Sequence, residues 1–211
     1  MGDKAQNVID IAVQEIGYFA PSDPEPGSKY ARWYAGEVEP GETWLLGPSW
    51  EIAWCCLFVS WCFAKAGVVT RGFPTYNTDI ALSALPKTVP YAQIMPGDLV
   101  IWDWNSDGAT DHIGIVERVG DYELVTIEGN HGNRVERVDR SNSKNMIRAI
   151  VRPDYDAQSY YTGIWDVPTV KRMQTWLRDL GYYHGLIDGG FDGGYSMTVA
   201  AFQHYLEDHN R

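Results

Sequence analysis

The chain lacks any apolar stretch long enough to cross a membrane. Its longest unbroken apolar run covers residues 52–59, far fewer than the roughly 18–20 residues that a spanning helix needs. The first residues, Met1–Asn7, are polar and charged and do not resemble a secretory signal. We therefore expect no membrane insertion and synthesis in the cytoplasm without a signal peptide, so a substrate outside the membrane would be reached by another route.

Basic residues are scarce. The chain has 17 Lys and Arg against 28 Asp and Glu, which gives a net charge of −11. A nucleic-acid binder needs a positive surface for phosphates, so this balance argues against nucleic acid as a partner. Aromatic residues are plentiful, with nine Trp and thirteen Tyr, and such rings can line grooves that bind by shape. We assign no oligomeric state.

Cysteine is also rare, and the three cysteines are close together. Cys55, Cys56 and Cys62 fall within eight residues, whereas a disulfide framework spreads an even number along the chain. Paired C-x-x-C motifs of a structural zinc site are absent from the sequence. Two interpretations remain: one cysteine is a nucleophile, or all three are small buried hydrophobic residues.

The spacing of apolar residues predicts an α+β fold. Helical patterns cover residues 8–16, closed by Gly17, and residues 54–66, closed by Gly67. After the turn signal at 96–98 the period changes to that of strands. Helices followed by strands favour helices packed on an antiparallel sheet. The expected strands are 99–102, 112–119, 122–128 and 146–152.

The tail predicts a second, smaller unit. Residues 154–166 are polar and form the best linker candidate between a domain at 1–153 and a module at 167–211. Within that module, two amphipathic helices flank a Gly-rich loop. Such a short helical pair has a marginal core, so the module either leans on the first domain or is part of a longer one.

Cys55 is the cysteine whose position favours reactivity. It lies at the start of the predicted helix, where the backbone N–H groups and the helix dipole favour a thiolate. Its own N–H is also placed to stabilise an oxyanion. Cys56 should point elsewhere, and Cys62 lies deeper in the apolar stripe.

A predicted hairpin supplies partners for this thiol. If Val119 pairs with Glu123, His112 lies opposite Asn130 and Gly114 opposite Glu128. Side chains alternate along a strand, so His112, Glu128 and Asn130 then share one face. Either Glu128 or Asn130 would orient His112 as the base of a nucleophile–base–orienter arrangement. The alternatives are a half-buried strand histidine, a solvated Glu128 and a turn Asn130.

These residues resemble those of a CHAP domain, the cysteine, histidine-dependent amidohydrolase/peptidase family, over roughly residues 5–152. The resemblance implies a papain-like α+β fold, Cys55 as nucleophile, His112 as base, and Glu128 and Asn130 as its polar partners. It also implies hydrolysis of amide bonds in peptidoglycan. The matching stretches are EIGY at 15–18, KYARWY at 29–34, WCCLFVSW at 54–61, PGDLV at 96–100, DHIGIV at 111–116 and IEGN at 127–130.

The tail resembles a peptidoglycan-binding module of the PG-binding-1 type. It departs from that pattern at 192–194, where DGG replaces the usual Gly-Pro turn, and it ends early. Together with the absence of a signal peptide, this organisation resembles phage or prophage endolysins, which reach the wall through a holin-type pore. The matching stretches are VKRMQ at 170–174, LGYY at 180–183, IDG at 187–189 and TVAAFQ at 198–203.

A loop before His112 has the spacing of a calcium site. Asp103, Asn105, Asp107 and Asp111 follow the opening of an EF-hand-like loop, but Gly114 stands where a bidentate Glu belongs. The alternative is a loop shaped by Asx turns. We expect no required cofactor, with calcium as the one candidate ion.

Four aromatic residues are candidates for substrate binding: Trp33, Tyr34, Trp54 and Trp104. The favoured reaction is that of an N-acetylmuramoyl-L-alanine amidase, on resemblance alone. A stem-peptide or cross-bridge endopeptidase is the alternative reaction. From another class, a non-catalytic wall-binding protein or a calcium-dependent structural module would use the same fold without turnover.

Overall fold

The computed structural model describes residues 2–155, except 40, 69, 71 and 85–87, and residues 167–185, 187 and 197–209. The helices are α1 (Asp3–Gln14), α2 (Lys29–Trp33), α3 (Cys55–Lys65), α4 (Thr78–Ala84), α5 (Val167–Asp179) and α6 (Met197–His209). The strands are β1 (Leu99–Trp102), β2 (His112–Val119), β3 (Leu124–His131), β4 (Arg134–Asp139) and β5 (Ile147–Val151). The shorter helical turns are η1 (Ala20–Ser22), η2 (Tyr34–Val38), η3 (Thr43–Leu46), η4 (Tyr91–Gln93) and η5 (Lys144–Met146).

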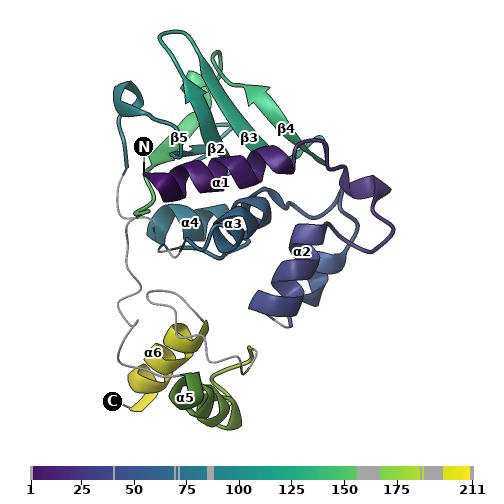
Figure 1. Ribbon diagram of the computed structural model, residues 1–211, viewed down its shortest axis with the longest axis vertical. Helices are drawn as coiled ribbons and strands as arrows, with labels where there is room; N and C mark the ends of the chain where they lie inside the picture. Colours follow the sequence, from purple (N-terminus) through teal and green to yellow (C-terminus); the bar gives the residue numbers. More distant parts are fainter. Residues whose placement is uncertain are drawn as a thin grey trace.

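The strands form one antiparallel sheet in the order β4-β3-β2-β1-β5. Helices α1 and α3 pack on one face of this sheet, against β2 and β3 (Figure 1). Ile113, Ile115 and Ile127 are fully buried in the core between the sheet and these helices. Alternation along the strands gives a second buried cluster that includes Trp102 and Val116. The predicted α+β class, with helices on an antiparallel sheet, is confirmed.

The predicted bounds of β3 were wrong at both ends. The turn from β2 occupies Gly120–Glu123, where the Gly120 N–H donates to the Glu123 carbonyl over 2.9 Å. Tyr122 therefore lies in the turn and is 94% exposed. The strand begins at Leu124 and continues past Glu128 to His131.

The predicted register was wrong at the turn but holds beyond a bulge. Val119 pairs with Leu124, one residue later than expected. A register shift between Val116 and Arg118 corrects the offset, because a bulge sets two residues against one. Beyond it, Ile115 pairs with Ile127, and continuing this register sets Gly114 beside Glu128.

Strand β4 was not expected from the sequence, although its turn carries a signal. Gly132 and Asn133 connect β3 to β4, and both have positive φ, +58° and +62°. A two-residue connection of this kind matches the twist of a hairpin. His131 and Arg134 pair directly across the turn. Helix α4 was also not expected.

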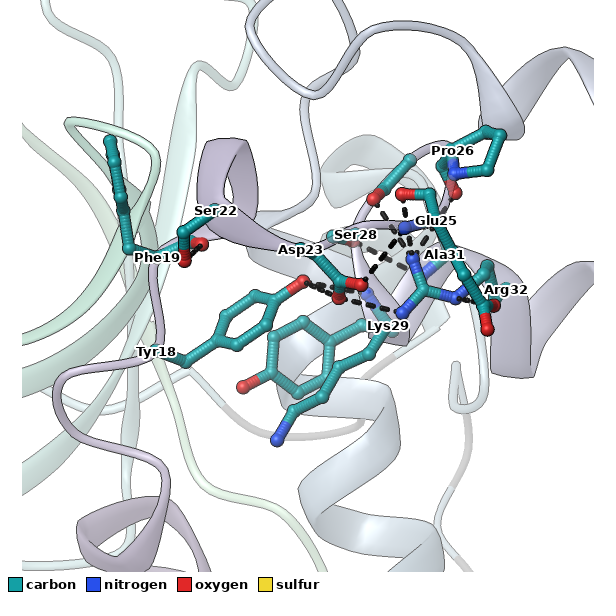
Figure 2. A network of polar contacts seen from close by, with 12 residues as sticks. Tyr18, Phe19, Ser22, Asp23, Glu25, Pro26, Ser28, Lys29, Ala31 and Arg32 are labelled. Atoms are coloured by element: carbon teal, nitrogen blue, oxygen red, sulfur yellow. Dashed lines mark hydrogen bonds and ion pairs between the residues drawn. The ribbon is translucent and has the colours of Figure 1, made fainter.

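A polar network fixes the loop between α1 and α2 (Figure 2). Arg32 donates to Asp23 over 2.6 Å and to the backbone carbonyls of residues 25–27 over 3.1–3.2 Å. Tyr18 bridges the same loop, since its hydroxyl donates to Asp23 and accepts the Lys29 N–H over 2.8 Å. This loop, rich in Pro and Gly, is therefore held in one conformation beside the start of α3.

An aromatic cluster continues from this network to α3. The Tyr18 ring lies edge-on to Tyr30 and Trp54, with centroids 5.2 and 5.8 Å away. Tyr30 stacks on Trp54 at 5.4 Å and meets Phe58 edge-on. Because Trp54 and Phe58 flank the first turn of α3, these contacts set the position of Cys55.

The described part of the tail contains the two expected helices. In the second unit, Leu177, Tyr183 and Ala201 form a buried apolar cluster, and the buried Gln174 amide donates to Thr198 over 3.0 Å. The predicted linker beyond residue 155 and most of the Gly-rich loop, including 192–194, lie outside the described residues. Tyr155, expected in the linker, packs on Phe63 and donates to the Gly97 carbonyl over 2.6 Å.

Among the helices of the described residues, none has both the length and the apolar character that membrane spanning requires.

Candidate active site

Cys55 is the first residue of α3 and is only 4% exposed. The first turn of α3 lies against the end of β3, and Gly129 makes this approach feasible. A Cβ at position 129 would lie 2.4 Å from Phe58 Cβ, far inside normal contact. Glycine is therefore required there to bring the Cys55 helix against the strand that carries Glu128.

The other two cysteines are poor nucleophile candidates. Cys56 and Cys62 are 1% and 0% exposed, and burial raises the pKa of each thiol well above its ordinary value. A thiol that stays protonated is a weak nucleophile. Their interpretation as packing residues agrees with this environment.

His112 begins β2, and its ring connects Cys55 to Glu128. Its Nε2 lies 2.8 Å from Glu128 Oε2, and its side chain also interacts with the Cys55 thiol. Because Nε2 is engaged with the carboxylate, Nδ1 is the ring nitrogen left for Cys55. His112 is therefore the residue that connects a candidate nucleophile to a carboxylate.

The charge of His112 reflects these two neighbours. Burial alone would lower its pKa, but interactions with Cys55 and then Glu128 outweigh burial and raise the pKa from 6.5 to about 9. The folded environment therefore favours an imidazolium at neutral pH, with Nε2 on the Glu128 carboxylate.

Glu128 is fully buried and strongly bound. Its Oε1 accepts from the Thr126 hydroxyl over 2.5 Å and from Arg140 Nε over 2.8 Å, while Arg140 Nη2 reaches Oε2 over 2.5 Å. Burial would raise the pKa of this carboxyl, but hydrogen bonds from Arg140 and then His112 dominate and lower it to about 2. Sequence reasoning missed Thr126 and Arg140.

Gly114 leaves the space that Glu128 occupies. A Cβ at position 114 would lie 2.8 Å from Glu128 Cγ and 3.2 Å from the Trp102 ring. The small residue thus lets the carboxylate side chain lie beside β2, two residues from His112.

Of the two residues expected to orient His112, Glu128 makes the contact. Asn130 lies where the β3–β4 ladder is interrupted, between Glu128 and His131. Its φ is +60°, a left-handed conformation that Asn tolerates better than most residues. Its proposed role in the site stays a prediction.

The structure separates the four aromatic candidates. Trp104 is 37% exposed, stacks on Trp102 at 5.4 Å and lies 6.0 Å from the His112 ring, centroid to centroid. Trp33 is half-buried beside the main core, so its substrate role stays a prediction.

Trp54 and Tyr34 were wrong as substrate contacts. Trp54 is 0% exposed because its ring fills the core between Tyr18 and Tyr30. Tyr34 is 4% exposed, with its hydroxyl donating to Glu39 over 3.0 Å. Both rings support the scaffold rather than a groove.

The candidate calcium loop has its oxygen atoms turned to the loop backbone. Asp103 accepts the N–H groups of Asp107 and Gly108 over 3.2 and 2.9 Å, and Asp111 accepts that of Trp104 over 2.6 Å. Asp107 and Asn105 likewise bond to each other and to nearby N–H groups. These are Asx turns, and the described residues contain no cluster of three or more acidic, His or Cys side chains suited to a metal.

Comparison with solved structures finds similar chains of low identity. One is a lipoprotein-like protein of the NLP/P60 family from Staphylococcus aureus subsp. aureus Mu50, with 15% identity, a TM-score of 0.44, and 72% of this chain and 42% of that chain covered. NlpC2 from Trichomonas vaginalis gives 15% identity, a TM-score of 0.44 and coverages of 72% and 47%. The present chain thus spans less than half the length of these two.

The P60 domain of an antigen from M. avium subspecies paratuberculosis gives 17% identity and a TM-score of 0.44, with 71% of this chain and 94% of that chain covered. No curated protein matches the chain. A family model described as CHAP domain matches residues 47–130, the stretch that includes Cys55, His112 and Glu128. The part of the chain that supplies the thiol, the imidazole and the carboxylate is therefore similar to a CHAP domain.

Proposed function

We propose that this chain hydrolyses an amide bond of bacterial peptidoglycan with Cys55 as the nucleophile. The observation that carries the proposal is the 2.8 Å contact of His112 Nε2 with the buried Glu128, beside Cys55, whose interaction with His112 helps raise the His112 pKa to about 9. The CHAP match over the same residues supports the substrate class. N-acetylmuramoyl-L-alanine amidase is the reaction we favour, and stem or cross-bridge endopeptidase is its alternative.

The reaction is an acyl transfer through a thioester. In the resting pair His112 already holds the proton of Cys55 as an imidazolium, and the sulfur attacks the amide carbonyl of the wall. This imidazolium protonates the departing amine, so the amide bond breaks and an acyl-enzyme remains. Neutral His112 then removes a proton from water, whose attack on the thioester releases the carboxylic acid and restores the starting pair of Cys55 and His112, which share this proton.

Residues around the dyad support these steps. Glu128 fixes the imidazole through Nε2 and balances its positive charge. The N–H groups of the first turn of α3 lack partners within the helix, so the N–H of Cys55 is suited to stabilise the oxyanion. Trp104, exposed beside His112, is the aromatic side chain best placed to contact substrate.

The proposal is tested by the release of amino groups from purified walls of several Gram-positive species. Wild type is compared with Cys55→Ala, and Cys56→Ala is the matched control, since Cys56 is adjacent in sequence but buried. We expect release by wild type and the control and none by Cys55→Ala. New amino-terminal L-Ala would identify the amidase, and amines of other stem or bridge residues the endopeptidase. Equal release by Cys55→Ala would remove Cys55 as nucleophile.

The tail and the route to the wall extend this proposal. We infer that the α5–α6 unit adds affinity for peptidoglycan, and that the protein acts in an endolysin-like way after holin-type release. The sequence resemblance of residues 170–203 supports both ideas. Deletion of residues 156–211 should weaken sedimentation with purified walls, whereas unchanged binding would argue against a wall-binding tail.

No step of this mechanism uses a metal ion. The loop at 103–111 uses its carboxylates on its own N–H groups, an arrangement that does not fit a calcium coordination shell without rearrangement. Calcium stays a prediction of the sequence, and it is tested by the thermal midpoint and by wall hydrolysis in millimolar calcium against EDTA. A higher midpoint in calcium would support the ion.

A further inference from the structure

Arg140 follows β4 directly and binds the Glu128 carboxylate through two nitrogens. Nε reaches Oε1 over 2.8 Å, and Nη2 reaches Oε2 over 2.5 Å. This two-point contact fixes the plane of the carboxylate as well as its distance, which one ammonium group cannot do. Arg140 therefore determines which way Glu128 Oε2 faces, and Oε2 is the atom that meets His112.

The guanidinium is itself held in place by two tryptophans. It lies over the rings of Trp102 and Trp104, 5.1 and 4.9 Å from their centroids. The side chain of Arg140 is only 14% exposed. A cation between aromatic faces and a buried carboxylate has little freedom to turn away.

The other charged groups near Glu128 either bind other partners or gain and lose a proton during the reaction. Glu136, its register partner on β4, pairs with His131, and Asp111, before His112, accepts the Trp104 N–H. Cys55 reaches the group through His112. Of the two cations that contact the carboxylate, His112 exchanges its proton in each cycle, whereas Arg140 stays charged.

This difference matters when His112 is neutral. After the imidazolium has protonated the leaving amine, Glu128 loses one of its two counter-charges while remaining in a buried environment that favours its neutral form. A protonated Glu128 would no longer attract the proton that His112 must take from water. A permanent cation on the carboxylate prevents this loss.

We propose that Arg140 is a positioning residue of the Cys55 site, which keeps Glu128 ionised and aimed at His112 throughout the reaction cycle. This inference rests on the proposed function for its catalytic meaning. The effect of Arg140 on the protonation of His112 and Cys55, transmitted through Glu128, does not depend on the substrate.

The test uses the full-length chain and the variants Arg140→Met, Arg140→Lys and Glu128→Gln, with Arg140→Met/Glu128→Gln as the double variant. Arg137→Met is the matched control, because Arg137 also binds a glutamate, Glu117, through two nitrogens, at 2.6 and 2.7 Å, but its side chain is 42% exposed. The substrate-free readout is the pH dependence of Cys55 alkylation by iodoacetamide, with the modified cysteine identified by mass spectrometry. Wall hydrolysis over the same pH range is the second readout.

We expect the acid limb of Cys55 alkylation to move up by about one pH unit or more in Arg140→Met, because Glu128 then protonates more readily. The acid limb should move less in Arg140→Lys, since lysine keeps the charge but not the two-point contact. It should not move in Arg137→Met. In the Glu128→Gln background, Arg140→Met should cause no further movement.

The proposal would be overturned if Arg140→Met lowered the rate of Cys55 alkylation equally at every pH and left its acid limb unmoved. It would also be overturned if the rate losses of Arg140→Met and Glu128→Gln multiplied in the double variant. If Arg140→Met does not fold, as judged by circular dichroism, Arg140→Lys decides by the same criterion. A shifted alkylation profile without any wall hydrolysis by wild type would refute the proposed function and leave the role of Arg140 intact.

Discussion

Two arginines, one on β4 and one directly after it, each bind a glutamate through two nitrogens, but the two pairs differ in their exposure to water. Arg137 binds Glu117 with side-chain exposures of 42% and 11%, whereas Arg140 binds Glu128 with exposures of 14% and 0%. Glu117 also contacts Arg118, at the surface. Water screens the first pair, but in the second each charge depends on its partner. The same two-nitrogen contact is therefore partly solvated in one place and buried beside His112 in the other.

The largest expected difference between the pairs comes from removing each glutamate. Glu128→Ala leaves the Arg140 charge buried without its carboxylate, so we expect the free energy of unfolding to fall by about 3–5 kcal/mol. Wall hydrolysis should fall by about 10²–10⁴-fold, since His112 loses its orienting partner. Urea denaturation and initial rates measure both.

Glu117→Ala is the counterpart, with an expected cost under about 1 kcal/mol and an unchanged rate. Equal losses of stability in the two variants would show that burial does not distinguish the pairs.

A smaller disturbance of the buried pair comes from the neighbouring strand. In Gly114→Ala the new Cβ would lie 2.8 Å from Glu128 Cγ, so the carboxylate must shift. We expect a loss of about 1–3 kcal/mol in unfolding free energy and a lower rate of Cys55 alkylation. Gly120→Ala is the control, because its Cβ would meet only Glu123 at 3.6 Å, an ordinary contact. If Cys55 is alkylated in Gly114→Ala at the wild-type rate, the position of Glu128 does not control the reactivity of Cys55.

The pH dependence of stability should carry the signature of the buried groups. His112 has its pKa raised from 6.5 to about 9, so its contribution is complete below pH 6.5 and is lost as the pH rises through 9. Glu128 has its pKa lowered from 4.5 to about 2, so its contribution is complete above pH 4.5 and is lost as the pH falls through 2. Their joint contribution is greatest between pH 4.5 and 6.5.

Denaturation curves of wild type and His112→Gln, measured across pH 5–10, isolate the contribution of His112 to the free energy of unfolding. We expect the difference between the two proteins to shrink as the pH rises from 6.5 to 9. A difference that stays constant would mean that the His112 pKa is the same in the folded and unfolded states.

The smallest effect expected is that of salt. Mobile ions screen exposed charges more than buried ones. In double-mutant cycles, the coupling of Arg137 to Glu117 should be at most about 1 kcal/mol and decline between low salt and 1 M NaCl. The coupling of Arg140 to Glu128 should change little over that range, and a parallel decline would indicate that water reaches the buried pair.

The strands nearest the dyad could be predicted because their patterns are unambiguous. Residues 99–102 and 112–119 combine β-branched residues with clear boundaries, and both were predicted with the bounds that the structure has. Alternation then placed His112 on the face of Glu128, which the bulge in β2 preserves. Helix α3 followed from its apolar stripe and the glycine at its end.

What escaped prediction lies on the edge strand. Between Arg134 and Asp139 one residue, Val135, is buried, so the charged sequence is typical of a loop as much as of a protected sheet edge. Without β4 there was no reason to bring Arg140 to Glu128. The Gly132-Asn133 pair, with both φ angles positive, was the available signal.

One further prediction was wrong and one stays a prediction, for different physical reasons. Composition shows that aromatic rings are abundant but not which of them fill the core, and Trp54 proved to be buried. Alternating acidic residues in a loop satisfy backbone N–H groups and metal ions by the same chemistry, so the spacing at 103–111 does not separate Asx turns from a calcium site.

The placement of Arg140 beyond β4 also has a consequence for how the protein matures. The thiol, the imidazole, the carboxylate and the guanidinium come from four chain segments between residues 55 and 140, and the last joins the others through the pairing of β3 with β4. Cys55 lies 57 residues before His112, and contacts between such distant segments form late because loop closure must precede them. A folding intermediate or a growing chain that ends before β4 would thus contain Cys55 but no organised centre. Reactivity at Cys55 would then report the completion of folding.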